Sequence, residues 1–350
     1  MIITVYAIAK NEEQHVERFV EACKDADDIC VLDTGSTDDT LPLLRGLGCI
    51  TEQEIIDPWR FDTARNRSLD LIPPDTDVAV CLDIDEVLLP GWREALEQAW
   101  KEDTMLGSYI CIAGRNADGS ARTSFYRQKL HRPNAGRWVY PVHEVFEGTG
   151  PRVSVPSMMC EHLPDEMKSR GSYLPLLELA ARERPQDARC AHYLGREYMY
   201  RGRWDDAIRE LQRALTIDWW DAQRSASERY IAKCMAEKGD IKGAYIHAIN
   251  SVCEAPVREA WYEAEKVCYL LRDWKGVVFF GERARQTPRA DSGINEAEAW
   301  GSGVSDYLSL GYWNLHQYDN ALRCGREALA LEPNNERIRR NVQFYEEAVG

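Results

Sequence analysis

The order of apolar and polar positions predicts alternating strands and helices in the first half of the chain. Apolar, β-branched runs indicate strands, and apolar residues at helical spacing indicate helices. Strands are predicted at Ile2–Ile8, Ile29–Leu32, Cys49–Ile56 and Val78–Leu82, and helices at Glu13–Cys23, Thr37–Leu47 and Asp62–Leu71. Ser36 with Asp39 has the form of a capping box, which places the start of the second helix near Thr37. We therefore expect an α/β fold with a mostly parallel sheet that binds ligands beyond the carboxyl ends of its strands.

From about Ser172 the strand signals stop, and small residues recur at helical spacing. The spacing resembles that of tetratricopeptide repeats, in which small residues let paired helices approach closely. The positions that carry the resemblance are Gly195, Ala207, Leu211, Ala214, Ala232, Ala244, Ala248, Ser251, Pro256, Val277, Gly281, Ala284, Ala321, Gly325, Ala328 and Pro333. Tyr173, Leu177, Ala180 and Pro185 resemble a half repeat that begins the stack. A plain helical bundle is the alternative.

The charge distribution supports the same division of the chain. Residues 1–165 carry 16 Lys and Arg against 29 Asp and Glu, whereas residues 166–350 carry 27 against 29. We therefore predict an α/β domain at 1–165 and an all-α repeat domain at 166–350. The net charge of −15 argues against non-specific binding to nucleic acid, which needs clustered cations.

Length and composition exclude some other classes. The 350 residues suffice for two domains, and the longest apolar runs are strand-sized, well short of the roughly 18 residues of a membrane span. The first apolar run lacks the basic start of a signal peptide. The eleven cysteines are scattered without a Cys-x-x-Cys pair, so we expect reduced thiols, no zinc site and a cytoplasmic location.

Two carboxylates follow the fourth predicted strand in the sequence Asp83-Ile-Asp-Glu86. Asp83 and Asp85 leave a strand two residues apart, so they can converge on one divalent cation, which in turn binds phosphate oxygens. The alternative interpretation of the same sequence is a solvated acidic turn before a helix. The pattern needs further motifs before it indicates a function.

Five motifs of the first half occur in a characteristic order. They are Lys10-Asn-Glu-Glu13, Asp33-Thr-Gly-Ser-Thr-Asp-Asp-Thr40, Ala64-Arg-Asn66, Leu82-Asp-Ile-Asp-Glu86 (the DXD motif) and Val142-His-Glu144. Their order and spacing resemble those of family 2 glycosyltransferases, a class of hexosyltransferases, and imply the GT-A fold with its Rossmann-like mixed sheet. They look most like the bacterial branch that includes the peptide S-glycosyltransferase of the sublancin pathway, which also carries a tetratricopeptide-like region. The resemblance implies an inverting, metal-dependent transfer of a sugar from a nucleotide sugar, expected to be UDP-linked.

The resemblance also implies roles for single residues. Asp33 would bind the uracil or ribose of the donor, with Ala7, Asn11 and Glu12 on the other side of the nucleotide. The donor pocket would further include Ser36, Arg65 and Asp83. Ser36 serves equally well as a pure helix cap.

The metal and the base are implied in the same way. Asp85 is the expected ligand of Mn²⁺ or Mg²⁺, assisted by His143 and Asp83, and the metal would neutralise the departing diphosphate. Glu144 and Glu86 are the candidates for the base that takes the acceptor proton.

A basic stretch interrupts the acidic domain between residues 115 and 137. The stretch contains one acidic residue, Asp118. Its basic residues are Arg115, Arg122, Arg127, Lys129, Arg132 and Arg137. They would hold the diphosphate or an anionic acceptor, or else balance the acidic surroundings. Trp138 and Tyr140 follow, as sugar-facing rings or as core residues.

The repeats suggest a large acceptor, because stacked helix pairs suit a peptide or a partner subunit. Trp219 and Trp220 lie at a predicted helix end and would form a contact for the acceptor or for a homodimer. A glycan, a lipid-linked sugar or a modified nucleic-acid base is an alternative acceptor.

A non-catalytic scaffold with a degenerate sugar-nucleotide domain is the competing class of function. A nucleotidyltransferase is disfavoured because Ala7–Glu13 contains no glycine.

Overall fold

The computed structural model describes residues 1–115, 119, 121, 123–163, 173–289, 294 and 296–349. The chain divides into two compact units, Met1–Ala180 and Ala181–Gly350. The domain boundary expected between 165 and 166 lies outside the described residues. In the described part of the chain, no helix has both the length and the apolar character that a bilayer crossing requires.

The first unit is built on an eight-stranded sheet with the order β3-β2-β1-β4-β7-β6-β10-β5. The strands are β1 (Ile3–Ala9), β2 (Asp28–Asp33), β3 (Ile50–Gln53), β4 (Val78–Cys81), β5 (Glu86–Leu88), β6 (Leu106–Ala113), β7 (Ser124–His131) and β10 (Arg152–His162). A separate two-stranded sheet pairs β8 (Gly136–Val139) with β9 (Val145–Gly148).

Half of this sheet departs from the predicted parallel arrangement. Strands β1 to β4 are parallel, as predicted, but β7 runs antiparallel to both β4 and β6, and β5 runs antiparallel to β10. The link from β6 to β7 covers residues 114–123, which is shorter than the crossover that a parallel pair needs. The sheet is therefore mixed, as the resemblance to the GT-A fold predicts. The strand pattern alone favours a mostly parallel sheet, and that inference does not hold for this half.

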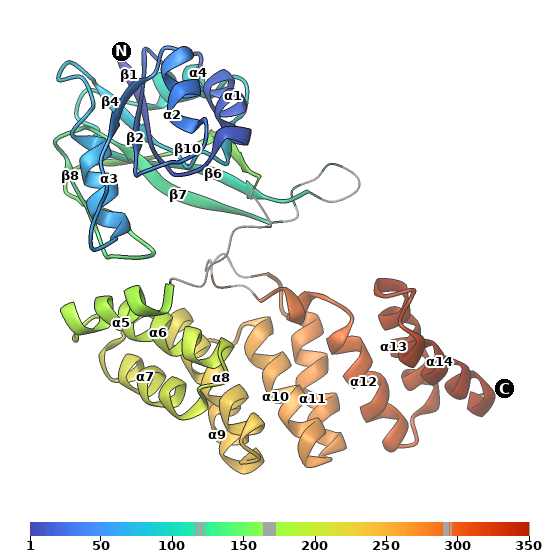
Figure 1. Ribbon diagram of the computed structural model, residues 1–350. Coiled ribbons are helices and arrows are strands. Elements are labelled where there is room, and N and C mark those ends of the chain that lie inside the picture. The colour runs from blue at the N-terminus through green and yellow to red at the C-terminus, as the bar shows by residue number, and fades with distance from the viewer. Residues whose placement is uncertain are drawn as a thin grey trace. The chain divides into compact units, whose positions relative to one another are not determined.

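Helices cover both faces of the sheet. They are α1 (Glu13–Ala22), α2 (Thr40–Gly46), α3 (Phe61–Leu69) and α4 (Trp92–Ala99). Helices α1, α2 and α4 lie on one face, and α3 with the β8–β9 hairpin covers the other (Figure 1). The strands supply alternate residues to the two faces: Val5 of β1 packs with α1 and α4, whereas Tyr6 packs with α3 and the hairpin.

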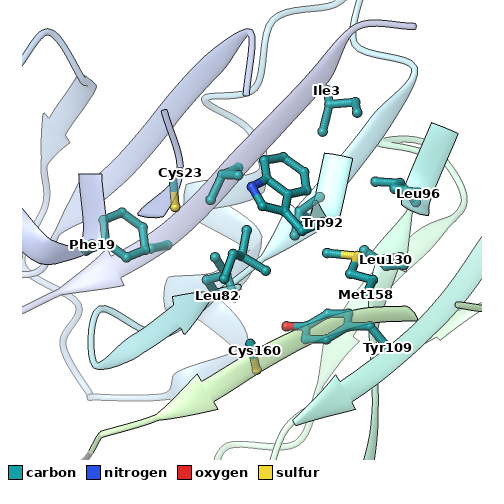
Figure 2. Close-up of a cluster of buried hydrophobic side chains, with 14 of the residues drawn as sticks. Ile3, Phe19, Cys23, Leu82, Trp92, Leu96, Tyr109, Leu130, Met158 and Cys160 are labelled. Atoms are coloured by element: carbon teal, nitrogen blue, oxygen red, sulfur yellow. The ribbon is translucent and has the colours of Figure 1, made fainter. Parts of the chain in front are cut away.

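The larger core is centred on an indole ring. Figure 2 shows Trp92 in the middle of this cluster, which also contains Ile3, Phe19, Leu82 and Met158. Trp92 is 1% exposed. Because the core ties strands β1, β4 and β10 to helices α1 and α4, it fixes the strand ends that carry the candidate site.

Helix α2 begins later than the sequence predicts. It starts at Thr40, three residues after the predicted Thr37, and Asp39 at its N-cap makes no side-chain capping bond. Ser36 instead accepts a hydrogen bond from the backbone N–H of Asn11, at 2.9 Å. The capping-box prediction is wrong because a tertiary partner takes the hydroxyl that local geometry would have used.

The second unit consists of helices packed in pairs. With α5 at the boundary, they are α5 (Tyr173–Glu183), α6 (Ala188–Tyr200), α7 (Trp204–Ile217), α8 (Asp221–Glu237), α9 (Ile241–Glu254), α10 (Arg258–Leu271), α11 (Trp274–Gln286), α12 (Gly303–Asn314), α13 (Tyr318–Leu331) and α14 (Glu336–Val349), with a 3₁₀ turn η1 (Ala297–Trp300) before α12. Helices α6 to α14 follow one another in chain order (Figure 1). The small residues of the repeat pattern lie between paired helices: Ala207 and Ala214 are fully buried, and a Cβ at Gly195 would meet Leu211 Cγ at 2.6 Å.

Candidate functional site

The polar motifs of the first unit collect at one edge of the sheet. Strands β2, β1 and β4 are parallel neighbours, so their carboxyl ends meet at the same edge. Asn11 follows β1, Asp33 ends β2 and Asp83 follows β4. The structure therefore brings together three of the predicted site residues that lie far apart in the sequence.

Side chains join the loops after β1 and β2. Asn11 has a left-handed backbone with φ 54°, a conformation that asparagine tolerates. Its Oδ1 accepts a hydrogen bond from the N–H of Thr37 at 2.8 Å, and its own N–H donates to Ser36. The N–H of Glu12 donates to Thr40 Oγ1 at 2.7 Å. These bonds hold the two loops as one wall, which explains why the Lys10–Glu13 motif and the Asp33–Thr40 motif occur together.

Asp33 is an ionised acceptor with one oxygen left over. Its Oδ1 accepts hydrogen bonds from the N–H groups of Gly35 and Ser36 and from Gln53 Nε2, at 2.8 to 3.0 Å. Burial alone would raise the pKa of Asp33, but the Ser36 hydroxyl, Gln53 and the two backbone N–H groups outweigh it and lower the pKa. Its Oδ2 is buried and has no hydrogen-bond partner among the described residues. A buried carboxylate oxygen without a donor suits a ligand that carries an N–H or O–H group.

Asp83 is held by two buried cations. Arg65 of α3 donates to Oδ1, and Lys129 of β7 donates to Oδ2 at 2.9 Å. Burial opposes ionisation, yet Arg65, Lys129 and Arg127 hold the pKa of Asp83 well below its usual range. Arg65 also contacts Glu144 Oε1 at 3.1 Å and the carbonyl of Leu82 at 3.2 Å. One guanidinium therefore connects the Ala64–Asn66, Asp83–Glu86 and Val142–Glu144 motifs.

Glu86 lies beneath the motif and is fully buried. Its Oε2 accepts from the N–H of Asp83 at 3.0 Å and from Lys129 at 3.3 Å, and Arg127 lies 3.1 Å from Oε1. These contacts fix the turn that carries Asp83 and Asp85. A fully buried carboxylate is shielded from an approaching acceptor, so the arrangement suits a positioning role for Glu86.

Asp85 contacts His162, a histidine that the sequence analysis did not single out. His162, the last residue of β10, has its Nε2 3.2 Å from Asp85 Oδ2, and both side chains are about one quarter exposed. The hydrogen bond to Asp85 raises the pKa of His162. Burial lowers it, but this hydrogen bond together with the negative charges of Asp85 and Glu86 outweighs burial, so the pKa is raised overall. The sequence offers one signal for it: His162 follows the apolar run Met158-Met-Cys160 after a single intervening residue, Glu161.

The remaining predicted residues occupy other positions in the first unit. His143 has φ 53° in the short link between β8 and β9, which Arg65 anchors through Glu144. Ala7 is buried in the middle of β1, with its methyl group in the larger core. Asn66 donates to the carbonyl of Trp138 and accepts from its N–H, both at 2.9 Å, and so holds the hairpin on α3.

The described cations of the basic stretch are paired with protein groups. Besides Arg127 and Lys129, Arg115 pairs with Glu161 at 2.8 Å, and Arg137 with Asp70 at 3.3 Å. Arg132 donates to the carbonyls of Thr104 and Glu102. Arg122 and Asp118 lie outside the described residues. The pairing favours charge balance over a free anion site. Trp138 and Tyr140 are buried, at 3% and 9% exposed, as core residues.

A second group of atoms of metal-ligand type is buried near Glu86, the last residue of the Asp83–Glu86 motif. Glu86, Cys111 and Cys160 have a carboxylate oxygen and two sulfurs within 4.8 Å of one another. Arg127 and Lys129 already neutralise Glu86 at this position. A divalent cation there would meet two positive neighbours, so the group fits a metal poorly.

Comparisons with known proteins agree with this division of the chain. Residues 4–152 match the sequence model of a family described as Glycosyl transferase family 2. Residues 259–349 match one described as Prolyl 4-hydroxylase peptide-substrate-binding domain. A search of curated proteins gives no match. The first match supports an enzyme that transfers sugar from a nucleotide sugar.

Solved structures resemble about half of the chain. The chain is similar to YrrB, described as a TPR protein with an unusual peptide-binding site, at 15% identity and TM-score 0.40, over 49% of this chain and 82% of that one. It is similar to the MamA protein at 16% identity and TM-score 0.38, over 46% and 81% of the two chains. The family matches and the described elements confirm the predicted fold class, a GT-A domain followed by a tetratricopeptide-like domain. The peptide S-glycosyltransferase branch stays a prediction.

Proposed function

We propose that the protein is an inverting, metal-dependent glycosyltransferase that moves a sugar from a UDP-sugar to a peptide or protein. The observation that carries the proposal is the meeting of Asp33, Arg65, Asp83 and Asp85 at the carboxyl edge of β2, β1 and β4. Those residues lie inside the segment that matches family 2 glycosyltransferases. Ligands of open α/β sheets bind at this edge.

In the proposal, the nucleotide lies against the joined loops after β1 and β2. The buried Oδ2 of Asp33 accepts the N–H of uracil or a ribose hydroxyl. Asn11, Glu12 and Ser36 form the wall beside it, and Ala7 contributes only backbone because its methyl group is in the core. Preference for UDP over dTDP or GDP rests on the resemblance to family 2 glycosyltransferases, since thymine and guanine also carry a ring N–H that Asp33 Oδ2 could accept.

The residues after β4 fit a divalent cation through Asp85. Both oxygens of Asp83 are engaged by Arg65 and Lys129, whereas Asp85 is partly exposed and faces an imidazole. A carboxylate and an imidazole are ligand types that Mn²⁺ accepts. We therefore propose Asp85 and His162 as the residues that hold the metal, with His143 kept as a predicted further ligand. The bound metal would neutralise charge on the diphosphate leaving group.

The protein side chains have separate tasks in the displacement. Arg65 and Lys129 hold Asp83 ionised and in place beside the donor sugar. The acceptor atom forms a bond to the anomeric carbon as the bond to the diphosphate breaks, and Glu144 takes the acceptor proton. Glu144 is 14% exposed and is oriented by Arg65, whereas Glu86 is fully buried. The proposal therefore assigns the base to Glu144 and a positioning role to Glu86.

A peptide or protein acceptor is supported by the second unit. Its C-terminal half matches a family described by peptide-substrate binding, and stacked helix pairs suit extended peptides. The predicted likeness to the peptide S-glycosyltransferase branch agrees with this acceptor class.

Hydrolysis of a panel of nucleotide sugars tests the proposal. We expect slow release of UDP from one UDP-sugar in the presence of Mn²⁺ or Mg²⁺, and loss of that activity in Asp85→Asn. Asp75→Asn is the matched control, since Asp75 is exposed in the turn before β4. Equal activity of the two variants, or activity that chelation does not remove, would contradict the role of Asp85.

A further inference from the structure

A short acidic segment of the second unit lies against the helices that precede it. The segment Glu296–Trp300 precedes α12 and includes the turn η1. Its sequence is Glu-Ala-Glu-Ala-Trp, so two carboxylates and one indole alternate with methyl groups. Its partners come from two helices, α8 and α10, each the first helix of its pair.

The first carboxylate is bound by two cations of α8. Arg229 Nε donates to Glu296 Oε1 at 2.8 Å, and Lys233 donates to Oε2. Burial would raise the pKa of Glu296, but Arg229 and Lys233 hold it at about 2. Glu296 is therefore a paired, ionised group at neutral pH.

The second carboxylate and the indole are bound by α10. Glu298 Oε1 lies 3.4 Å from both Lys266 Nζ and Tyr262 OH. Trp300 Nε1 donates to Glu259 Oε1 at 2.9 Å, and the guanidinium carbon of Arg258 lies 4.5 Å from the centre of its ring. Side chains of the two helices thus contact every second residue of the segment.

The cations of these helices that bind the segment are Arg229, Lys233 and Lys266, and the last two share one carboxylate of α10. Glu263 Oε2 lies 3.3 Å from Lys266 Nζ and 4.0 Å from Lys233 Nζ, so two of the three charges need a further anionic partner. Arg229 is 1% exposed, and a buried cation is costly unless it is paired and hydrogen-bonded. Its Nη2 is buried and has no hydrogen-bond partner within the described ranges, so the acidic segment leaves one buried donor unused. The face made by Arg229, Lys233 and Lys266, here called the basic face, is therefore an anion-binding surface that its present occupant does not fully satisfy.

The positive surroundings extend to α6. His192 is 2% exposed, and burial followed by the charges of Arg196, Arg229 and Arg189 lowers its pKa to about 3. A ligand longer than the acidic segment would meet further positive charge on α6.

We propose that the basic face binds an acidic peptide of a protein partner with the pattern acid-x-acid-x-aromatic, and that Glu296–Trp300 is a tethered competitor that the partner displaces. The tether keeps the segment at an effective concentration of about millimolar, so it suppresses binding of a free peptide. The inference does not depend on sugar transfer, because no nucleotide or donor takes part.

A fluorescent peptide of residues 294–302 tests the proposal by anisotropy titration with the full chain. We expect the variant Glu296→Gln/Glu298→Gln to bind the peptide at least about tenfold more tightly than wild type, because the competitor is weakened. Adding Lys233→Ala/Lys266→Ala should abolish that binding. The matched control, Lys242→Ala/Lys275→Ala on exposed positions of α9 and α11, should leave it unchanged.

A second peptide with Gln in place of both Glu residues tests the charge requirement without altering the basic face. It should bind neither wild type nor the Gln variant. Equal affinity of the two peptides, or equal affinity of wild type and the Gln variant for the acidic peptide, would overturn the proposal. Because the assay contains no nucleotide sugar, its failure is separate from any failure of the proposed transferase activity.

Discussion

Arg65 and Asp83 form an ion pair that joins helix α3 to the turn after β4, and Arg65 is almost fully buried. The same guanidinium binds Glu144 and the carbonyl of Leu82, so it connects three of the motifs that resemble family 2 glycosyltransferases. The cluster is therefore structural as well as catalytic in the proposed function. Removal of the Arg65 side chain should therefore lower the stability of the first unit, whether or not the protein is assayed for activity.

Replacement of this arginine should destabilise the first unit strongly. Arg65→Gln leaves Glu144 without its cation and Asp83 with Lys129 as its remaining partner. Breaking a buried pair costs about 3–5 kcal/mol of unfolding free energy. Arg67→Gln is the control on the same helix, because the pair of Arg67 with Glu54 is half-exposed and such pairs contribute about 0–1 kcal/mol. Urea unfolding of both variants measures the difference, and similar losses would contradict the central position of Arg65.

The first unit should lose stability in mild acid through His131. The ring is buried and stacked on Phe146, and its Nε2 lies 2.6 Å from Tyr6 OH while Nδ1 lies 3.0 Å from the carbonyl of Arg132. Burial lowers the pKa of His131 to about 4, below its ordinary value of 6.5. The stabilisation is therefore complete above pH 6.5 and is lost as the pH falls toward 4, by about 3 kcal/mol in all.

Hydrogen exchange of the amides of β4 and β7 between pH 7 and 4 measures this loss. His131→Gln should be less stable at pH 7 but should show a flatter dependence on pH. The exposed His316→Asn serves as the control and should keep the wild-type dependence. An unchanged dependence in His131→Gln would rule out this histidine as the cause.

A methyl group at Gly195 should destabilise the α6–α7 pair. A Cβ there would meet Leu211 Cγ at 2.6 Å and Leu211 N at 3.1 Å, and overpacking of this kind costs about 1–3 kcal/mol. Gly46→Ala is the matched control, since a Cβ at Gly46 meets nothing within 4 Å in a helical position where alanine is favoured by up to about 1 kcal/mol. Thermal unfolding should therefore shift downward for Gly195→Ala and stay level or rise for Gly46→Ala.

The tryptophan pair between α7 and α8 should contribute to association rather than to folding. Trp219 is 88% exposed and Trp220 42%, as predicted for a contact patch. Trp219→Ser should change the free energy of unfolding by no more than about 0.5 kcal/mol. We expect it to weaken self-association in sedimentation velocity, in line with the predicted homodimer; unchanged sedimentation would remove Trp219 from any such contact.

The sequence predicts the elements well where one local signal is strong. Strand β1 and helix α1 lie within one residue of their predicted bounds, because an apolar run and a helical stripe each need only local spacing. The sheet direction beyond β4 was not predictable from such patterns, since the orientation of β7 and β10 depends on which strands pair.

The site was predicted in its residue types more than in its pairings. Asp33, Asp83 and Asp85 are recognisable because each follows an apolar strand. Lys129 and Arg127 were seen only as part of a basic stretch, because their contacts with Asp83 and Glu86 depend on the register of β7 against β4. His162 was missed because its partner, Asp85, lies 77 residues away in the sequence.

Calorimetric titration with UDP in the presence of Mn²⁺ tests the central claim most directly. We expect saturable binding by the wild-type chain, weakened at least about tenfold in Asp33→Asn, because the buried carboxylate oxygen would meet the uracil or ribose donor. Asp28→Asn, at the other end of β2, should bind as wild type does. Folded protein that binds neither UDP nor any UDP-sugar with Mn²⁺ or Mg²⁺ would contradict the account.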